Sequence, residues 1–192
     1  SQKLLIGPWQ HIARGTGVTG DHYFGVAADA LFIDLDGIHL RWFDYWLKGI
    51  DNGIMTEPPV KIFVMGDDIW RDEAEWPLAR ARPVDYYLHS GGKANSLRGD
   101  GILSSEPPAS ESPDVFLYNP FAPVPTTGGP LCCNSYFMNG GAFDQREVEA
   151  REDVLVYSTP VLEQDVEVTG PITVTLWAAS SASDTDFTAQ LV

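Results

Sequence analysis

The sequence predicts a mainly β protein in which a short α/β segment precedes an antiparallel β-sandwich. One strongly amphipathic helix follows an apolar run within residues 1–52, whereas the rest of the chain shows runs of period two bounded by Gly, Pro, Asp or Asn. No helical pattern of similar strength interrupts those later runs. Because βαβ alternation is missing there and two long connections occur, at 90–113 and 119–150, we expect a sandwich of the jelly-roll type. Those connections exceed the ~12 to 15 residues usual for structureless loops, so they either carry function or pack over the sandwich.

The α/β segment begins with a buried-strand pattern at 3–6 and continues into a helix after Asp34. Asp34 or Asp36 can cap the start of this helix, and Gly49 can end it. Its apolar positions recur at spacings of three and four, which predicts a broad apolar stripe in the core. The stripe comprises Leu35, Ile38, Trp42, Phe43, Tyr45, Trp46 and Leu47.

We place a domain boundary at the turn signal Asp51-Asn52-Gly53, which precedes the stiff Glu57-Pro58-Pro59 segment. This gives an α/β part, 1–52, and a β part, 53–192, that is expected to be truncated. Strands are predicted in the β part at 60–65, 84–89, 115–118, 154–157, 172–178 and 187–192. Both chain ends fall inside strand patterns, so we expect a piece of a longer protein.

The charge of the chain argues against two classes of partner. With 27 acidic and 12 basic residues among 192, the formal net charge is -15, which would repel phosphate backbones and anionic lipid. No apolar run approaches the ~20 residues that span a bilayer. We therefore expect a soluble protein with no nucleic-acid or membrane partner. The sequence leaves its location open but favours the cytoplasm over secretion, and it does not reveal the oligomeric state.

The sequence predicts no metal and no cofactor. The two cysteines, Cys132 and Cys133, are adjacent, and His22, His39 and His89 are scattered without the spacing of a zinc site. Two Asp-x-Asp stretches, 34–36 and 184–186, look like pieces of calcium loops. Both lack the longer ligand series with a final Glu, so turns or helix caps are the better interpretation.

His11 is the candidate catalytic residue. It follows the first strand pattern and a Gly7-Pro8 break, and ligands of open α/β sheets bind beyond the carboxyl ends of the strands. Imidazole, with an ordinary pKa of about 6.5, can accept and return a proton near neutrality. The alternative is a structural histidine whose ring nitrogens form hydrogen bonds with neighbouring backbone groups. Trp9, just before it, either walls an acyl pocket or braces the turn.

Two other patterns are weaker candidates for catalytic residues. No Gly-x-Ser-x-Gly nucleophile elbow occurs in the sequence, and the similar stretch at 88–92 lacks the first glycine and is interpreted as a turn. Asp21 and His22 could form a second acid–base pair, but their Gly-Thr-Gly-rich surroundings favour a solvated turn.

Several stretches together resemble the CocE/NonD hydrolases, the X-Pro dipeptidyl-peptidase (S15-like) group of esterases, acylases and peptidases. The resemblance covers essentially the whole chain, in stretches 4–11, 22–25, 40–49, 57–66, 141–146, 153–157, 167–171 and 183–187. It implies that residues 1–52 end an α/β-hydrolase domain and that 53–192 form the family's non-catalytic, galactose-binding-like jelly-roll. It also implies that His11 is the histidine of a Ser-His-Asp triad.

The resemblance further implies that the chain alone is inactive. In α/β-hydrolases the triad runs Ser, Asp, His along the chain, so the serine and the aspartate would precede residue 1 in a missing upstream catalytic domain. The substrate would be a small ester, amide or X-Pro peptide, and the sequence does not say which. The rival hypothesis is a non-catalytic binding or structural module. In that case Trp70, Trp76 and Tyr86 would stack on a sugar, although they could equally fill a core.

Overall fold

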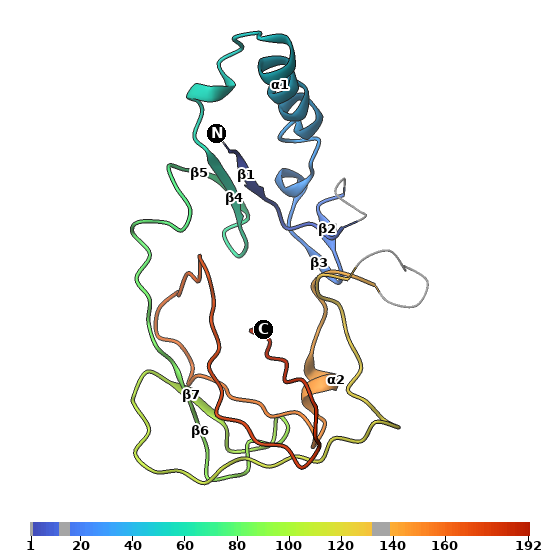
Figure 1. Cartoon of the computed structure of the whole chain (residues 1–192), viewed down its shortest axis with the longest axis vertical. Helices are drawn as coiled ribbons and strands as arrows, with labels where there is room; N and C mark the ends of the chain where they lie inside the picture. The colour runs from blue at the N-terminus through green and yellow to red at the C-terminus, as the bar shows by residue number, and fades with distance from the viewer. Residues whose placement is uncertain (1, 12–15, 132–138) are drawn as a thin grey trace.

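The computed structural model describes residues 2–11, 16–131 and 139–192, and it is elongated (Figure 1). Helix α1 (Leu35–Lys48) lies at one end, above a sheet of β1 (Leu4–Ile6), β4 (Val60–Val64) and β5 (Ile69–Glu73). The small hairpin of β2 (Val18–Thr19) and β3 (His22–Tyr23) lies beside this sheet. The other end holds β6 (Tyr87–His89), β7 (Ile102–Ser104) and the short helix α2 (Arg146–Glu149). The architecture is thus β-strands with few helices, which agrees at this level with the sequence prediction.

The three-stranded sheet has the order β1-β4-β5 and is mixed. Strand β1 pairs in parallel with β4, with Leu4 opposite Val60, and β4 pairs antiparallel with β5. Since α1 lies between β1 and β4 in the sequence, these elements form a β–α–β connection of the kind that parallel pairing requires. The pairing joins strands from both sides of Asn52, where the sequence suggests a boundary.

Helix α1 has the ends that its sequence predicts. Asp34 is the N-cap and its carboxylate accepts a hydrogen bond from the Gly37 N–H, while Gly49 ends the helix in the left-handed conformation at φ 69°. Lys48 forms an ion pair with Asp44 one turn earlier, at 2.6 Å.

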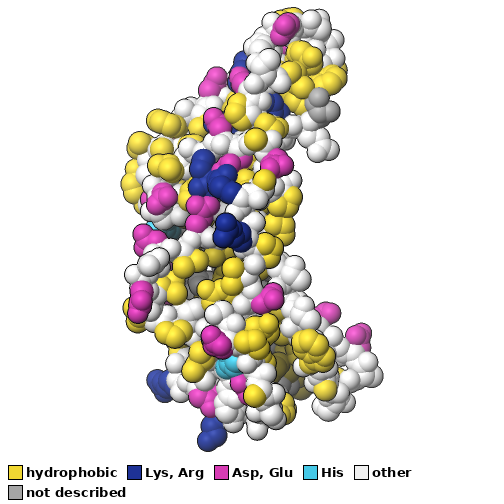
Figure 2. Space-filling view, turned by 90° about the vertical axis from the view of Figure 1, so that its left-hand side faces the viewer, with side chains coloured by type: hydrophobic (Ala, Val, Ile, Leu, Met, Phe, Trp, Pro, Cys, Tyr) yellow, Lys and Arg dark blue, Asp and Glu magenta, His cyan; other side chains and the backbone are white. Residues whose placement is uncertain are grey.

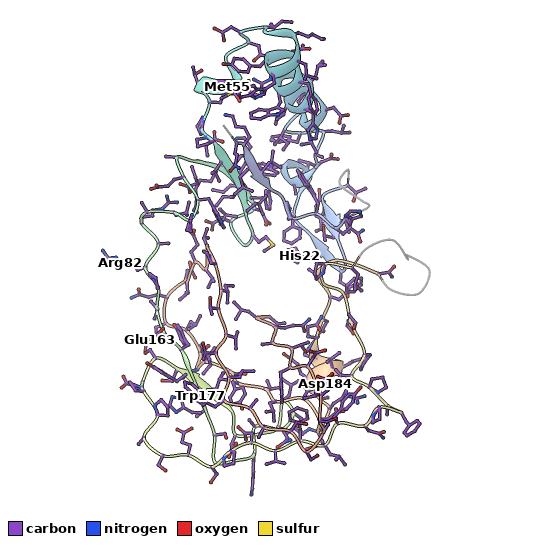
Figure 3. The ribbon with its side chains drawn as sticks, in the orientation of Figure 1. His22, Met55, Arg82, Glu163, Trp177 and Asp184 are labelled. Carbon is purple, nitrogen blue, oxygen red and sulfur yellow. The ribbon has the colours of Figure 1, made fainter. Side chains whose placement is uncertain are left out.

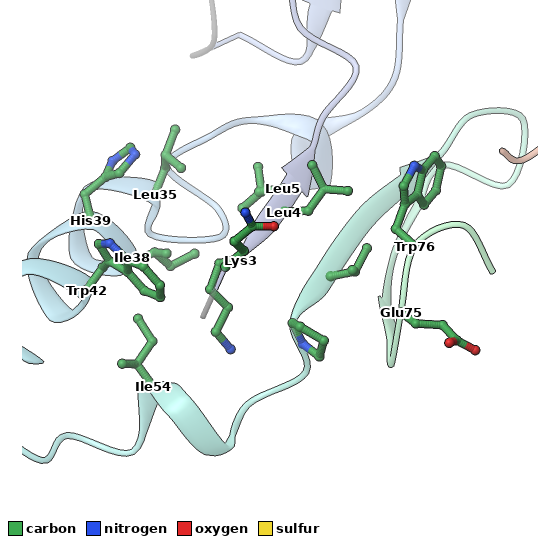
Figure 4. A pocket seen from close by; sticks show the side chains of 13 residues that line it. Lys3, Leu4, Leu5, Leu35, Ile38, His39, Trp42, Ile54, Glu75 and Trp76 are labelled. Carbon is green, nitrogen blue, oxygen red and sulfur yellow. The ribbon is translucent and has the colours of Figure 1, made fainter. Parts of the chain in front are cut away.

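The prediction that the apolar stripe of α1 belongs to the core is wrong within this chain. None of the residues of α1 is buried, and Leu47 is 78% exposed. Ile38 and Trp42 instead face Leu4 and Leu5 of β1 across a cavity of about 660 Å³ (Figure 4). The narrow sheet offers too little surface to cover so broad a stripe.

The β-rich remainder forms fewer strands than its alternating pattern predicts. The segments 115–118, 172–178 and 187–192 contain no strand, and 154–157 contributes only an isolated bridge from Leu155 to Asn95. Of the second predicted strand, 84–89, only β6 forms. Conversely, β5 was not predicted, and β7 lies in a segment interpreted as a connection. Period-two patterning shows which face a residue would take, but a strand exists only where another strand supplies its hydrogen bonds.

Many apolar side chains are therefore exposed, among them Phe121 at 96%, Val161 at 96% and Trp177 at 94%. Figure 2 shows such side chains spread over one face of the molecule among acidic ones. The small core that does form lies beside the sheet, where Phe24, Ala28 and Phe63 pack together with Trp70. In the part of the chain that the structure describes, no helix is long and apolar enough to cross a membrane.

Candidate active site: the histidine loop

His11 lies five residues beyond the end of β1 and its side chain is exposed. It is therefore not sealed in the apolar interior. Residues 12–15, which follow it, lie outside the described part of the chain. Among the described residues, the hydrogen bonds do not include one to the His11 ring. The structure thus presents an accessible imidazole past the carboxyl end of a parallel strand, and the catalytic role of this residue stays a prediction.

The backbone that leads to His11, residues 7–10, is tied down at two points. The carbonyl oxygen of Pro8 accepts a hydrogen bond from the Thr19 hydroxyl of β2, at 2.5 Å. The indole N–H of Trp9 donates to the carbonyl of Ala28, also at 2.5 Å. Gly7 is required here because a Cβ at this position would lie 2.6 Å from the Trp9 ring. We call residues 7–11 the histidine loop.

Trp9 braces this loop by packing on the small core. Its ring lies 5.5 Å from that of Trp70 on β5, and the Trp70 ring lies 5.3 Å from Phe63 on β4. Phe63 in turn meets Phe24 edge to face at 6.0 Å. Tilted and edge-to-face pairs at these distances are favourable beyond their buried area. Of the two interpretations of Trp9, the structure shows the brace, and Trp70 fills a core position.

A close backbone approach secures the β2–β3 hairpin, which holds Pro8. Gly20 forms a parallel bridge with Ala142, whose carbonyl accepts the Asp21 N–H at 2.8 Å. Gly141 (φ 119°) allows this contact because a Cβ there would lie 2.6 Å from the Gly20 nitrogen. Residues from the second half of the chain therefore buttress the hairpin on which the histidine loop rests.

Asp21 and His22 do not form an acid–base pair. Both are exposed, and the His22 ring (labelled in Figure 3) lies 4.3 Å from the Phe24 ring. The hydrogen bonds between described residues do not join the two side chains. The interpretation as a solvated turn fits Asp21, whereas His22 begins β3 and pairs with Thr19.

The serine-containing stretch at 88–92 ends strand β6 at His89 and bends at Gly91 and Gly92, in agreement with its interpretation as the end of a strand followed by a turn. Ser90 donates a hydrogen bond to Asp114 at 2.7 Å and accepts one from the Gly92 N–H. Asp114 also accepts from the Tyr157 hydroxyl and the Ala94 N–H. Burial opposes ionisation of this carboxyl, but the three hydrogen bonds bring the pKa of Asp114 below its ordinary value. Asp114 thus ties Ser90 to Tyr157 and to the backbone of Ala94.

The neighbouring His89 links the end of β6 to the connection 90–113 through two contacts, to Glu111 and to Glu106, which we call the His89 clasp. One ring nitrogen contacts the Glu111 carboxylate at 2.6 Å and the other contacts the carbonyl of Glu106 at 2.8 Å. A carbonyl only accepts, and an ionised carboxylate only accepts, so both ring nitrogens must donate. The hydrogen bond to Glu111 accordingly raises the pKa of His89.

Sequence reasoning missed the most strongly perturbed carboxyl group of the sheet. Glu73, 7% exposed on β5, accepts hydrogen bonds from Arg80 and Arg71, and Arg71 also contacts Glu167 through two nitrogens. The hydrogen bonds from Arg80 and Arg71 lower the pKa of Glu73 to about 2, although burial opposes this. Arg80 lies seven residues and Arg71 two residues from Glu73, and Glu167 belongs to a distant segment. No local sequence motif therefore predicts this network.

No cluster of three or more potential metal ligands occurs among residues 2–11, 16–131 and 139–192. Cys132 and Cys133 lie outside these ranges.

Comparison with known families adds to this geometry. The X-Pro dipeptidyl-peptidase C-terminal non-catalytic domain matches residues 52–192. The chain belongs to this family, and its resemblance to CocE/NonD hydrolases is confirmed.

The relatives of the chain are hydrolases that are much longer. A cocaine esterase from Rhodococcus sp. (strain MB1 Bresler) is 44% identical over 99% of this chain and 33% of the relative. A putative serine esterase from Mycobacterium tuberculosis is 31% identical over 96% of this chain and 27% of the relative. A putative Xaa-Pro dipeptidyl-peptidase from Bacillus anthracis is 28% identical over 79% and 22%. The chain thus spans about a third or less of their length.

A solved structure supports the fold. The crystal structure of an aminopeptidase from the marine sediment archaeon Thaumarchaeota archaeon superposes with a TM-score of 0.54 at 24% identity, covering 81% of this chain and 24% of that chain. At this identity the likeness concerns the fold alone.

Proposed function

We propose that the chain is the C-terminal part of a serine hydrolase and that His11 is the general base of its triad. His11 takes the proton of a serine that precedes this chain, the serine attacks the substrate carbonyl, and the resulting acyl-enzyme is hydrolysed by water that the same imidazole activates. An aspartate, also upstream, holds the ring tautomer and stabilises the imidazolium. The chain by itself is inactive because it carries only one of the three groups.

The observation that carries this proposal is the placement of His11. The imidazole is exposed beyond a parallel strand, on a loop in which Pro8 and Trp9 are held by hydrogen bonds to β2 and to Ala28. A triad base needs access to substrate and a fixed position, and this loop offers both. The names of the relatives, esterase and dipeptidyl-peptidase, support hydrolysis of an acyl bond.

The same proposal accounts for the two parts of the chain. Residues 1–52, with the strand β1 followed by the helix α1, then complete the α/β-hydrolase domain, and β1 pairs in parallel with β4 of the following part. Residues 53–192 form the family's jelly-roll. The exposed apolar side chains of α1, among them Phe43 and Leu47, then pack against the upstream domain. The substrate is an ester, an amide or an X-Pro peptide.

The test is substitution of the histidine in the longest polypeptide that contains this chain. His11→Ala should lower kcat by about a thousandfold or more, since loss of one triad member removes most chemical assistance. His22→Ala, a nearby exposed histidine, is the matched control and should change kcat little. A fluorophosphonate should label the longer polypeptide and leave the present chain unlabelled. Near-normal turnover of His11→Ala refutes the proposal.

A second candidate function is a non-catalytic module that binds carbohydrate. The family description, a non-catalytic domain, favours it, and Trp177 is 94% exposed in the part that the family covers (Figure 3). A glycan array probed with the whole chain tests this function. Specific binding that Trp177→Ala abolishes would support it, and an empty array would remove it.

A further inference from the structure

We propose that Trp70, which lies in the part of the chain matched to the non-catalytic domain, is a positioning residue for the histidine loop. This inference rests on the proposed function, and it assigns a role in the chemistry to a residue that does not touch the reacting atoms. Trp70 acts through Trp9, which stands two residues before His11.

Two indoles anchor on one short segment. Trp9 donates to the carbonyl of Ala28 at 2.5 Å, and Trp70 donates to the carbonyl of Ala27 at 2.6 Å. These adjacent carbonyls belong to the 3-10 helix Val26–Ala28, in which Ala28 is completely buried. The rings also contact each other, with centroids 5.5 Å apart and planes tilted by 50°. The loop, the 3-10 helix and β5 therefore meet at one junction, which we call the tryptophan junction.

Contacts with the sheet hold the tryptophan junction in place. Both rings are half-buried and contact each other, so a displacement of the Trp70 ring acts directly on Trp9. Trp70 is held against Phe63 of β4, and β4 pairs with β1, the strand from which the histidine loop emerges. The start of the loop and its Trp9 anchor are thus fixed to the same sheet. Pro8 is held by Thr19 and Trp9 by Ala28, so the residues that lead to Gln10 and His11 are fixed on the hairpin and the small core.

The expected consequence concerns turnover more than affinity. A general base must lie within hydrogen-bond reach of the serine hydroxyl, and a shift of about 1 Å can cost about a hundredfold in rate. Loss of the Trp70 N–H in Trp70→Phe frees one carbonyl and shrinks the ring that supports Trp9. Because a positioning residue acts on the base and not on the bound substrate, KM should change little.

The experiment measures kcat and KM of Trp70→Phe and Trp70→Leu in the longest polypeptide that contains this chain, normalised to active sites titrated with a fluorophosphonate. We expect kcat to fall by about tenfold in Trp70→Phe and further in Trp70→Leu, with KM within twofold. The apparent pKa of the base in the pH profile of kcat/KM should shift as well, which general destabilisation would not cause. Phe121→Leu, at an aromatic side chain that is 96% exposed and lies outside the tryptophan junction, is the control and should match the unsubstituted enzyme.

The coupling to Trp9 is tested by a double-substitution cycle. If the two indoles act as a unit, adding Trp9→Phe to Trp70→Phe should cost much less than Trp9→Phe costs alone. Independent, multiplicative losses, or an unchanged kcat per active site in Trp70→Phe, overturn the positioning role. The proposed function fails separately, because only a normal kcat in His11→Ala contradicts it.

Discussion

The substitution Glu73→Gln tests the energetics of the β5 network. Glu73 is 7% exposed and accepts hydrogen bonds from Arg71 at 2.6 Å and from Arg80 at 2.6 Å. Each such charge-assisted bond contributes about 1.5 to 3 kcal/mol when buried. The Arg80 side chain is 58% exposed, so solvent strongly screens its hydrogen bonds to Glu73. We therefore expect Glu73→Gln to lower the free energy of unfolding by about 2 kcal/mol. For a chain of this size that corresponds to roughly 4 to 8 °C in Tm.

The assay is urea-induced unfolding followed by tryptophan fluorescence, repeated at several pH values. The pKa of Glu73 falls from an ordinary 4.5 to about 2 in the folded state. A carboxyl group with a lowered pKa stabilises the fold fully above its unfolded value and loses that contribution as the pH falls through its folded value. The difference in the free energy of unfolding between the unsubstituted protein and Glu73→Gln should therefore be constant near pH 7 and shrink between about pH 4.5 and pH 2.

Glu75→Gln is the matched control, since Glu75 is exposed two residues along the chain and should change stability by less than about 0.5 kcal/mol. The reasoning is refuted if Glu73→Gln unfolds at the same urea concentration as the unsubstituted protein. It is also refuted if the stability difference persists undiminished at pH 2.

The His89 clasp and the Gly141 contact give two further predictions. Because the pKa of His89 is raised above 6.5, its contact with Glu111 stabilises the fold fully below pH 6.5 and loses its effect as the pH rises through the raised value. In urea titrations the stability deficit of Glu111→Gln should therefore be full below pH 6.5 and shrink as the pH rises above it, and a deficit that does not change with pH contradicts this. Gly141→Ala should cost about 2 to 4 kcal/mol in calorimetry, whereas Gly129→Ala, also at positive φ but in open space, should cost about 1 kcal/mol; equal losses would show that the contact with the hairpin is unimportant.

How far the sequence predicts the structure depends on whether the information is local. The limits of α1 are predicted well because Asp34 and Gly49 act within one turn of the helix. The strand β5 is not, since Arg71 and Asp72 give it a charged, turn-like composition and its pairing with β4 decides its conformation. The alternation at 172–178 shows the opposite failure, in which a good strand pattern lacks a neighbouring strand.

The candidate site shows the same division. The Gly7-Pro8 break and the histidine after a strand pattern could be recognised in the sequence. The partner of Trp9 could not, because Trp70 reaches it only through the register of β4 with β5, in which Phe63 stands opposite Trp70. Contacts between residues far apart in the chain depend on that register, which cannot be predicted from the amino-acid composition.

The word non-catalytic in the family's description needs a restricted meaning for this chain. The turn at Asn52 stays the predicted boundary, yet the β1–β4 pairing and the Trp9–Trp70 contact both join residues from its two sides. Removing residues 1–52 would strip β4 of its parallel neighbour and uncover Phe63, which is only 7% exposed. The reverse dependence follows from the same contacts, because the histidine loop has its Trp9 anchor on a core that β4 and β5 help to build. If His11 is the base, a region without reacting groups still determines where that base stands.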